Sequence, residues 1–332
     1  MKQLIKNLVE ITGPSGYEHQ VREFIRAEVE PYADEIREDA LGNLIVRKGE
    51  KTDAGKTIMI AGHMDEIGIM ATHIDENGYI RFTTIGGVSP ITCIGGRVRF
   101  LDGTLGVIGM ERIKDRTILP AFDKIFIDVG ASNKQDCPVK VGDVAAFDRP
   151  FEDLGNRLVS KAMDDRIGAA IMIQALKDLD TSVNELFFVF TTQEEVGLRG
   201  AKTSAYGINP DIGIAVDITG SGDTPNGIKM EVSLGKGPAL KVRDNSLIVD
   251  PKMIEWTSKA AEKIGIPYQY EVLTMGGTDA GAINLSRAGV PATCLSIPTR
   301  YVHSPSEMVD YNDVLNTVRL LVELVSKPVE LG

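Results

Sequence analysis

Short apolar runs that end in polar side chains are the feature that most constrains the fold of this chain. The clearest runs cover residues 57–61, 185–191, 212–216 and 292–297, with a further strand expected over 43–47. Runs of this kind are typical of strands that are buried on both faces of a parallel sheet. Helical periodicity lies around and between them, over residues 17–29, 166–179, 251–264 and 312–325. The pattern therefore predicts an α/β fold.

Residues 69–159 break this pattern. They form short β-like runs separated by Gly, Asp and Pro, with little helical periodicity. The 332 residues of the chain also exceed what one compact core usually organises. We therefore predict a discontinuous α/β domain, residues 1–68 and 160–332, interrupted by a small β-rich insert over 69–159.

The charge balance restricts the possible partners. There are 47 acidic and 36 basic residues, and the net charge of −11 repels nucleic acids and anionic membranes. No apolar run approaches the roughly 18 residues of a membrane span, and the first residues lack the apolar centre of a signal peptide. The three cysteines form no close pair, which fits a reducing compartment. We expect a cytoplasmic protein that binds neither nucleic acid nor membrane.

Most of the side chains that can bind metal ions follow one of the predicted strands. The exception, Asp164, lies at the start of the predicted helix 166–179. In a parallel sheet the carboxyl ends of the strands share one edge, and ligands bind there. We therefore expect these side chains to converge. They are His63, Asp164, Glu194, Glu195, Asp217 and His303.

Imidazole and carboxylate groups together suit zinc and related metals. Two histidines and three carboxylates suffice for two ions if one carboxylate bridges them. Ions about 3.5–4 Å apart polarise a substrate carbonyl and lower the pKa of a shared water molecule. A carboxylate that is free of metal can then take the proton, so one of Glu194 and Glu195 can coordinate while the other acts as the base. This chemistry predicts hydrolysis.

Other interpretations use the same residues. A glycoside hydrolase such as an endoglucanase also needs two carboxylates, but the adjacent Glu194 and Glu195 are poorly placed to flank a glycosidic bond. One Trp and 6% aromatic residues also offer little surface for sugar stacking. A noncatalytic metal-binding scaffold is the second alternative, and it would not need Glu194 as an unliganded carboxylate. Asp164 could equally be part of an acidic helix cap.

Five motifs follow one another along the chain: AGHMDEIG at 61–68, KAMDDR at 161–166, TQEEVGLRGA at 192–201, MGGTDA at 275–280 and RYVHS at 300–304. In this order they resemble the M42 family of metallo-aminopeptidases, which includes glutamyl aminopeptidases and the tetrahedral TET peptidases. The resemblance covers essentially the whole chain. It implies a mixed-sheet zinc-exopeptidase (phosphorylase/hydrolase-like) catalytic domain. It also implies that the insert serves dimerisation and assembly, commonly into a dodecamer.

The resemblance also implies a metal site for two divalent ions per subunit, with zinc as the expected metal and cobalt as the alternative. Asp164 would bridge the two ions. His63 and Asp217 would complete one site, and Glu195 and His303 would complete the other. Short peptides are the implied substrates.

The same resemblance makes Glu194 the general base and implies that Asp65 orients the His63 imidazole. It further implies a cis peptide bond between Asp164 and Asp165. The predicted function is a dinuclear aminopeptidase that removes N-terminal residues through a metal-bridged hydroxide. Its preference for acidic, neutral or basic N-terminal residues stays open. Asp217 and Asp279 are candidates to bind the substrate amino group, and candidate pocket residues are Arg166, Arg243 and Gly276–Thr278.

Overall fold

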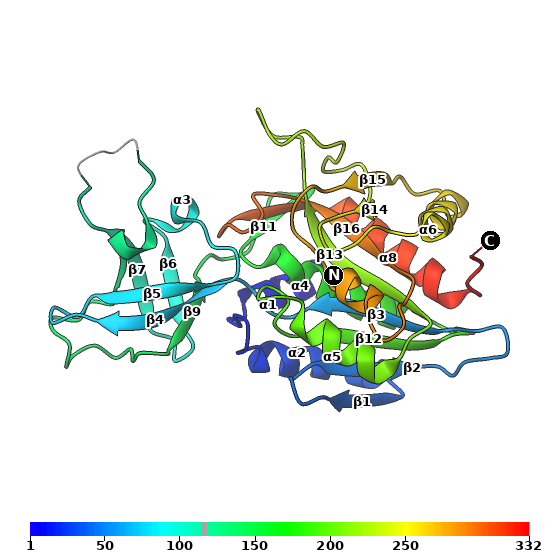
Figure 1. Ribbon diagram of the computed structural model, residues 1–332, viewed down its shortest axis with the longest axis horizontal. Coiled ribbons are helices and arrows are strands. Elements are labelled where there is room, and N and C mark those ends of the chain that lie inside the picture. Colours follow the sequence, from blue (N-terminus) through cyan, green and yellow to red (C-terminus); the bar gives the residue numbers. More distant parts are fainter. Residues whose placement is uncertain (114–117, 332) are drawn as a thin grey trace.

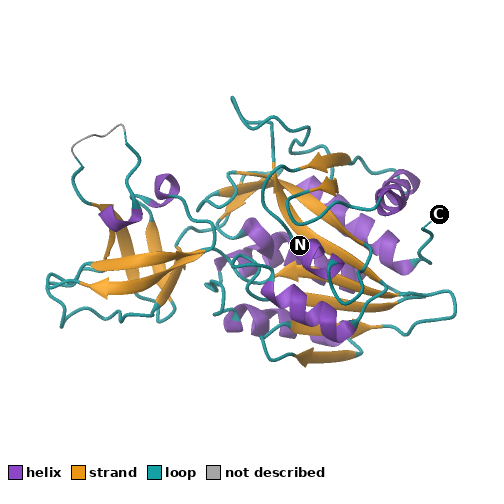
Figure 2. Cartoon of the chain, in the orientation of Figure 1, coloured by secondary structure: helices purple, strands orange, loops and turns teal. Residues whose placement is uncertain are grey.

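The computed structural model describes residues 1–113 and 118–331, which form two parts joined by extended connections (Figure 1). One part is built on an 11-stranded mixed sheet, and the other is a small closed β-barrel. Figure 2 shows that the helices gather almost entirely on the first part. A mixed α/β fold with a small all-β part was predicted, and it is confirmed. Within the described residues, no helix is long and apolar enough to cross a membrane.

The large sheet has the strand order β1-β2-β12-β3-β13-β16-β17-β11-β10. Its central strands are parallel and almost fully buried, which explains their continuous apolar sequences. These central strands are β12 (Glu185–Thr191), β3 (Thr57–His63), β13 (Ile212–Gly220) and β16 (Ala292–Arg300). The flanking strands are β1 (Glu35–Glu38), β2 (Leu44–Lys48), β10 (Glu152–Asp153), β11 (Arg157–Ser160), β14 (Ala239–Arg243), β15 (Gln269–Val272) and β17 (Glu307–Asp310).

Two groups of helices cover the sheet. In one group α4 packs against α8, α1 and α2, and against β3 and β13; in the other, α5 packs against α7 and β12. Helix α4 is buried along nearly its whole length, so its sequence is apolar on most sides. The helices are α1 (Lys2–Glu10), α2 (His19–Val29), α4 (Met163–Asp178), α5 (Arg199–Ile208), α6 (Pro251–Lys263), α7 (Asp279–Asn284) and α8 (Tyr311–Ser326).

The barrel has its own apolar core, separate from that of the α/β part. Along β6 and β7 exposed and buried residues alternate, as expected for strands with one face towards a core. The barrel closes where Gly68 on β4 pairs with Ala146 on β9. Its elements are β4 (Gly68–Ile74), β5 (Ile80–Ile85), α3 (Pro90–Cys93), β6 (Arg97–Phe100), β7 (Leu105–Met110), β8 (Ile125–Asp128) and β9 (Val144–Phe147).

The barrel is shorter than the predicted insert. Strand β10 and all of β11 except Ser160 fall within residues 69–159, yet β11 pairs with β17 of the large sheet and β10 pairs with β11. This pairing joins segments that lie far apart in the sequence, so the local pattern of residues does not reveal it. The all-β part with its own core therefore runs from Gly68 to Phe147.

Candidate metal centre

The carboxyl ends of the central strands bring the predicted metal-binding side chains to one edge of the sheet. His63 is the last residue of β3 and stands opposite Thr191, the last residue of β12. Asp217 lies near the end of β13, and His303 follows β16 in a turn. The edge carries the side chains because all four strands run in the same direction.

Two groups of three side chains can each hold a metal ion, and they share Asp164. In each group the candidate ligand atoms lie within 4.8 Å of one another. The first group is His63, Asp164 and Asp217, and the second is Asp164, Glu195 and His303. All five residues that the sequence nominated as ligands are therefore brought together.

The Asp164 carboxylate faces both imidazoles at once. Its Oδ1 lies 3.0 Å from His63 Nε2, and its Oδ2 lies 3.3 Å from His303 Nε2. The peptide bond between Asp164 and Asp165 is cis, as predicted. The adjacent Asp165 carboxylate accepts a hydrogen bond of 3.2 Å from the backbone N–H of His63, which ties α4 to the end of β3.

Asp65 holds the turn that carries the two glutamates. Its carboxylate accepts the backbone N–H groups of Glu194 at 3.0 Å and Glu195 at 3.2 Å, and the Ser15 hydroxyl at 2.6 Å. His63 Nδ1 lies 3.1 Å from the Asp65 carbonyl oxygen and 3.5 Å from its carboxylate. Both backbone and side chain of Asp65 therefore contact this imidazole.

Burial and crowding of negative charge dominate the electrostatics of the site. Burial raises the pKa of Glu195 to about 8, and repulsion from Asp164 adds to the shift. Burial likewise raises the pKa of Glu194 and Asp217 well above the usual range. Burial opposes ionisation of Asp164 as well, but hydrogen bonds with His303 and His63 outweigh it and lower the pKa of Asp164. A cation would relieve this crowding.

The donor set fits a metal ion. Glu195 Oε1 is buried and has no hydrogen-bond partner among the described residues, although it belongs to one of the two groups. Nitrogen and carboxylate oxygen donors in groups of three match zinc and other first-row metals. Glu194 belongs to neither group but lines the same cavity.

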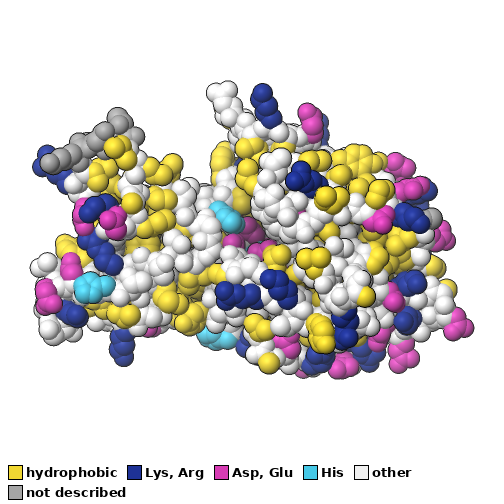
Figure 3. Space-filling view, in the orientation of Figure 1, with side chains coloured by type: hydrophobic (Ala, Val, Ile, Leu, Met, Phe, Trp, Pro, Cys, Tyr) yellow, Lys and Arg dark blue, Asp and Glu magenta, His cyan; other side chains and the backbone are white. Residues whose placement is uncertain are grey.

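A cavity of about 940 Å³ opens onto both groups. Figure 3 shows acidic side chains and a histidine in a hollow between the barrel and the α/β part. Gly276–Thr278 line this cavity, as predicted, but Arg166 and Arg243 do not. Of the two candidates to bind the substrate amino group, Asp217 lines the cavity. Asp279 does not line it; its side chain is buried and accepts a 2.5 Å hydrogen bond from the Thr191 hydroxyl.

Arg166 is a structural residue rather than a pocket residue. Its side chain is fully buried and donates hydrogen bonds to the carbonyl oxygens of Met64, Leu8, Ile11 and Gly13. The motif around Asp164 made a site role attractive, but the arginine points back towards the N-terminal segment.

Sequence reasoning missed two contributors to the site. Glu307 accepts the backbone N–H groups of Asp164 at 3.0 Å and His303 at 2.8 Å, so it joins residues from both groups. The sequence offers little signal for this role, because Glu307 is simply the acidic first residue of the short strand β17. Gly87 is the second: a Cβ there would lie 2.3 Å from His303 Nδ1, so only glycine leaves room for that ring.

The fold and the two groups of side chains define a candidate metal centre at the carboxyl ends of the central strands. The family model for M42 glutamyl aminopeptidase matches residues 42–320, and the chain belongs to this family. The predicted resemblance, and with it the prediction of a hydrolase acting on peptide bonds, is confirmed.

Similar proteins agree with this assignment. An aminopeptidase from the archaeon Desulfurococcus kamchatkensis is 42% identical with a TM-score of 0.94, over 98% of this chain and 94% of that one. The lysyl aminopeptidase of Pyrococcus furiosus is 36% identical over 98% of this chain and 96% of its own length. The TET1 peptidase of Pyrococcus horikoshii, which can assemble into a tetrahedron or a large octahedral shell, is 34% identical. Its TM-score is 0.89, over 98% of this chain and 99% of that one.

Proposed function

We propose that this chain is an aminopeptidase that works with two divalent metal ions, zinc or alternatively cobalt. The observation that carries the proposal is the position of Asp164, whose two carboxylate oxygens face two different imidazoles. One carboxylate can thereby bridge two ions. His63 and Asp217 would complete the first site, and Glu195 and His303 the second.

When bound, such ions polarise a carbonyl oxygen and make a water molecule more acidic. Glu194 is free of both groups and lines the cavity, so it can take the proton from that water and pass it to the leaving amine. Asp65 positions Glu194 through its backbone N–H and holds the His63 imidazole by its Nδ1 edge. Because Asp65 contacts both Glu194 and His63, it fixes the position of the proposed base relative to a proposed metal ligand.

The alternatives are less well supported. An endoglucanase would have no use for His63 and His303 on either side of a shared carboxylate. A noncatalytic metal-binding scaffold would not need a carboxylate such as Glu194, which is partly buried in the same cavity but belongs to neither ligand group.

We further propose that the substrates are short peptides and that copies of the chain self-associate, into dimers and then a dodecamer. The TET1 peptidase, which can assemble into a tetrahedron or a large octahedral shell, and a similar solved structure described as a dodecamer support this. The assembly role would fall to the barrel within predicted residues 69–159, and the chemistry to residues 1–68 and 160–332. Three cysteines without a disulfide among the described residues fit a cytoplasmic location.

The decisive experiment compares the chelated protein with the protein reloaded with zinc or cobalt on aminoacyl p-nitroanilides and carboxymethylcellulose. We expect hydrolysis of an anilide only after metal is restored. Glu194→Gln should lower kcat by about 10²–10⁴-fold. Glu231→Gln, at an exposed position, is the matched control and should not change kcat. Full peptidase activity in Glu194→Gln, or activity on cellulose that chelation does not affect, would overturn the proposal.

A further inference from the structure

The walls of the substrate cavity carry almost no free charge outside the metal centre. From this we infer that the enzyme prefers uncharged, apolar N-terminal residues such as Leu and Met over Glu and Lys; the inference rests on the proposed aminopeptidase function. Among the described lining residues there is no lysine, and every acidic one is a ligand candidate or Glu194. Arg300 is the one arginine of the described lining.

Arg300 is already occupied. Its Nε donates to Asp223 Oδ1 at 2.9 Å and its Nη2 donates to Asp223 Oδ2 at 2.8 Å, so the two side chains form a bidentate ion pair. This pair lowers the pKa of Asp223 to about 2. Paired arginine and carboxylate hold each other strongly in this geometry. A substrate glutamate would have to displace Asp223, so Arg300 does not make the cavity selective for acidic residues.

Beyond the metal centre the described lining is uncharged apart from Arg300, and it combines hydroxyl and amide side chains such as Thr224 and Asn226 with an apolar patch. Ile228 and Met275 line the cavity and remain 45% and 53% exposed, and Leu273 lines it beside them. Ile228 lies beside the end of β13, since its Cδ1 is 3.6 Å from the position of a Cβ on Gly220, three residues after Asp217. Figure 3 shows hydrophobic side chains next to the acidic hollow. A substrate side chain that covers this wall removes apolar surface from water.

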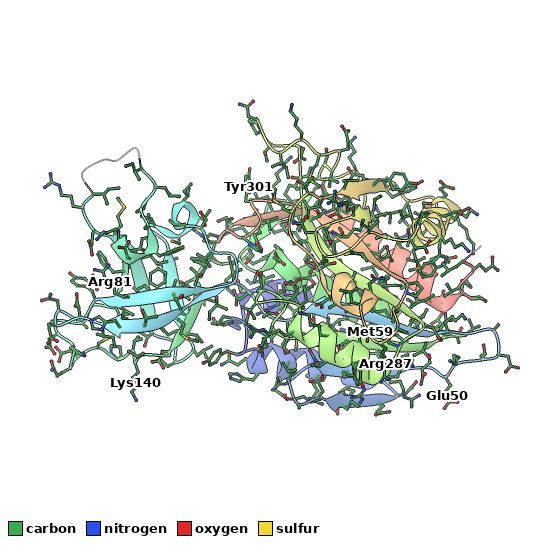
Figure 4. All side chains as sticks on the ribbon, viewed as in Figure 1. Glu50, Met59, Arg81, Lys140, Arg287 and Tyr301 are labelled. Atoms are coloured by element: carbon green, nitrogen blue, oxygen red, sulfur yellow. The ribbon has the colours of Figure 1, made fainter. Side chains whose placement is uncertain are left out.

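The same wall penalises a charged side chain, which would lose water without finding a free opposite charge outside the metal centre. Tyr301, labelled in Figure 4 at the edge of the α/β part nearest the barrel, adds an aromatic ring to the lining. We therefore expect kcat/KM for Leu and Met substrates to exceed that for Glu and Lys substrates by about 10- to 100-fold.

The first test measures preference in two independent ways. Metal-loaded protein is assayed on Leu, Met, Glu and Lys p-nitroanilides, and calorimetry gives Kd values of Leu-Ala, Glu-Ala and Lys-Ala for the metal-loaded Glu194→Gln variant. Leu and Met should lead in kcat/KM, and Leu-Ala should bind most tightly. A lead for Glu or Lys would overturn the inference while leaving the aminopeptidase proposal intact. Hydrolysis of none of the anilides would instead overturn the proposed function.

The second test moves the preference by design. Ile228→Lys places a cation on the apolar wall and should raise the Glu-to-Leu ratio of kcat/KM by at least about 10-fold. Met275→Lys tests the same wall from another loop if the first variant does not fold. Leu285→Lys is the matched control, since Leu285 is 77% exposed and lies outside the cavity lining. An unchanged ratio in a folded wall variant would show that this wall does not contact the substrate side chain.

Discussion

Replacing Glu307 with Gln should weaken metal binding although Glu307 is not itself a proposed ligand. The Glu307 carboxylate accepts two backbone N–H groups, from Asp164 at 3.0 Å and from His303 at 2.8 Å. A glutamine has only one carbonyl oxygen, so its NH₂ group must face one of these donors. Leaving a buried donor without an acceptor costs about 1–3 kcal/mol, which corresponds to about 5- to 150-fold in an equilibrium constant. Since the two donors belong to residues of the shared centre, we expect zinc affinity to fall by about 10- to 100-fold.

The assay is a zinc titration of chelated protein against a chromophoric competitor, with thermal unfolding of the chelated form measured alongside. Glu231→Gln makes the same chemical change at an exposed position and should leave zinc affinity unchanged. Wild-type affinity for both ions in a folded Glu307→Gln variant would refute the argument that these two hydrogen bonds hold the ligands in place.

Two further predictions follow from other contacts. Gly87→Ala should displace His303, because the new Cβ would lie 2.3 Å from Nδ1, and peptidase kcat/KM should fall at least about 10-fold. Gly207→Ala, with nothing within 4 Å of its Cβ position, should leave kcat/KM unchanged, and equal activity of the two variants would contradict the steric argument. Asp223→Asn should cost about 1–2 kcal/mol of unfolding free energy at pH 7, since the Arg300 hydrogen bond lowers the pKa of Asp223 to about 2. The wild-type advantage is present above the unfolded pKa of about 3.9 and should disappear as pH falls towards 2, as urea unfolding at several pH values would show; an advantage that does not depend on pH would contradict this linkage.

The parts of the fold that local pattern could predict are those with a continuous apolar signal. The four central strands were predicted because burial on both faces leaves a run of apolar residues, as in Glu185–Thr191. The site was predictable for a related reason: each strand ends at one edge, so His63 and Asp217 had to approach each other. Helices α5 and α7 were not predicted: α7 has only six residues, whereas α5 (Arg199–Ile208) is amphipathic and its pattern was overlooked.

The parts that could not be predicted depend on contacts between distant segments. Nothing in the sequence around Glu307 distinguishes it from other acidic residues. Only the position of β17 places its carboxylate 3.0 Å from the backbone nitrogen of Asp164. Arg166 lies two residues after the ligand candidate Asp164 in the sequence, yet its side chain donates hydrogen bonds to carbonyl groups near the N-terminus. The pairing of β11 with β17 also joins distant segments, so the local pattern does not show that residues 157–160 belong to the large sheet.

The closure of the barrel has a consequence for how this architecture can change. Gly68 and Ala146 are paired neighbours, so the barrel leaves the α/β part and returns to it at almost the same point. A segment whose two ends meet can be lengthened, shortened or exchanged without pulling on its host. Evolution could thus remodel the barrel, or an engineer could replace it with the barrel of a relative. His63 and Asp164, which lie on either side of the junction in the sequence, would keep their 3.0 Å contact.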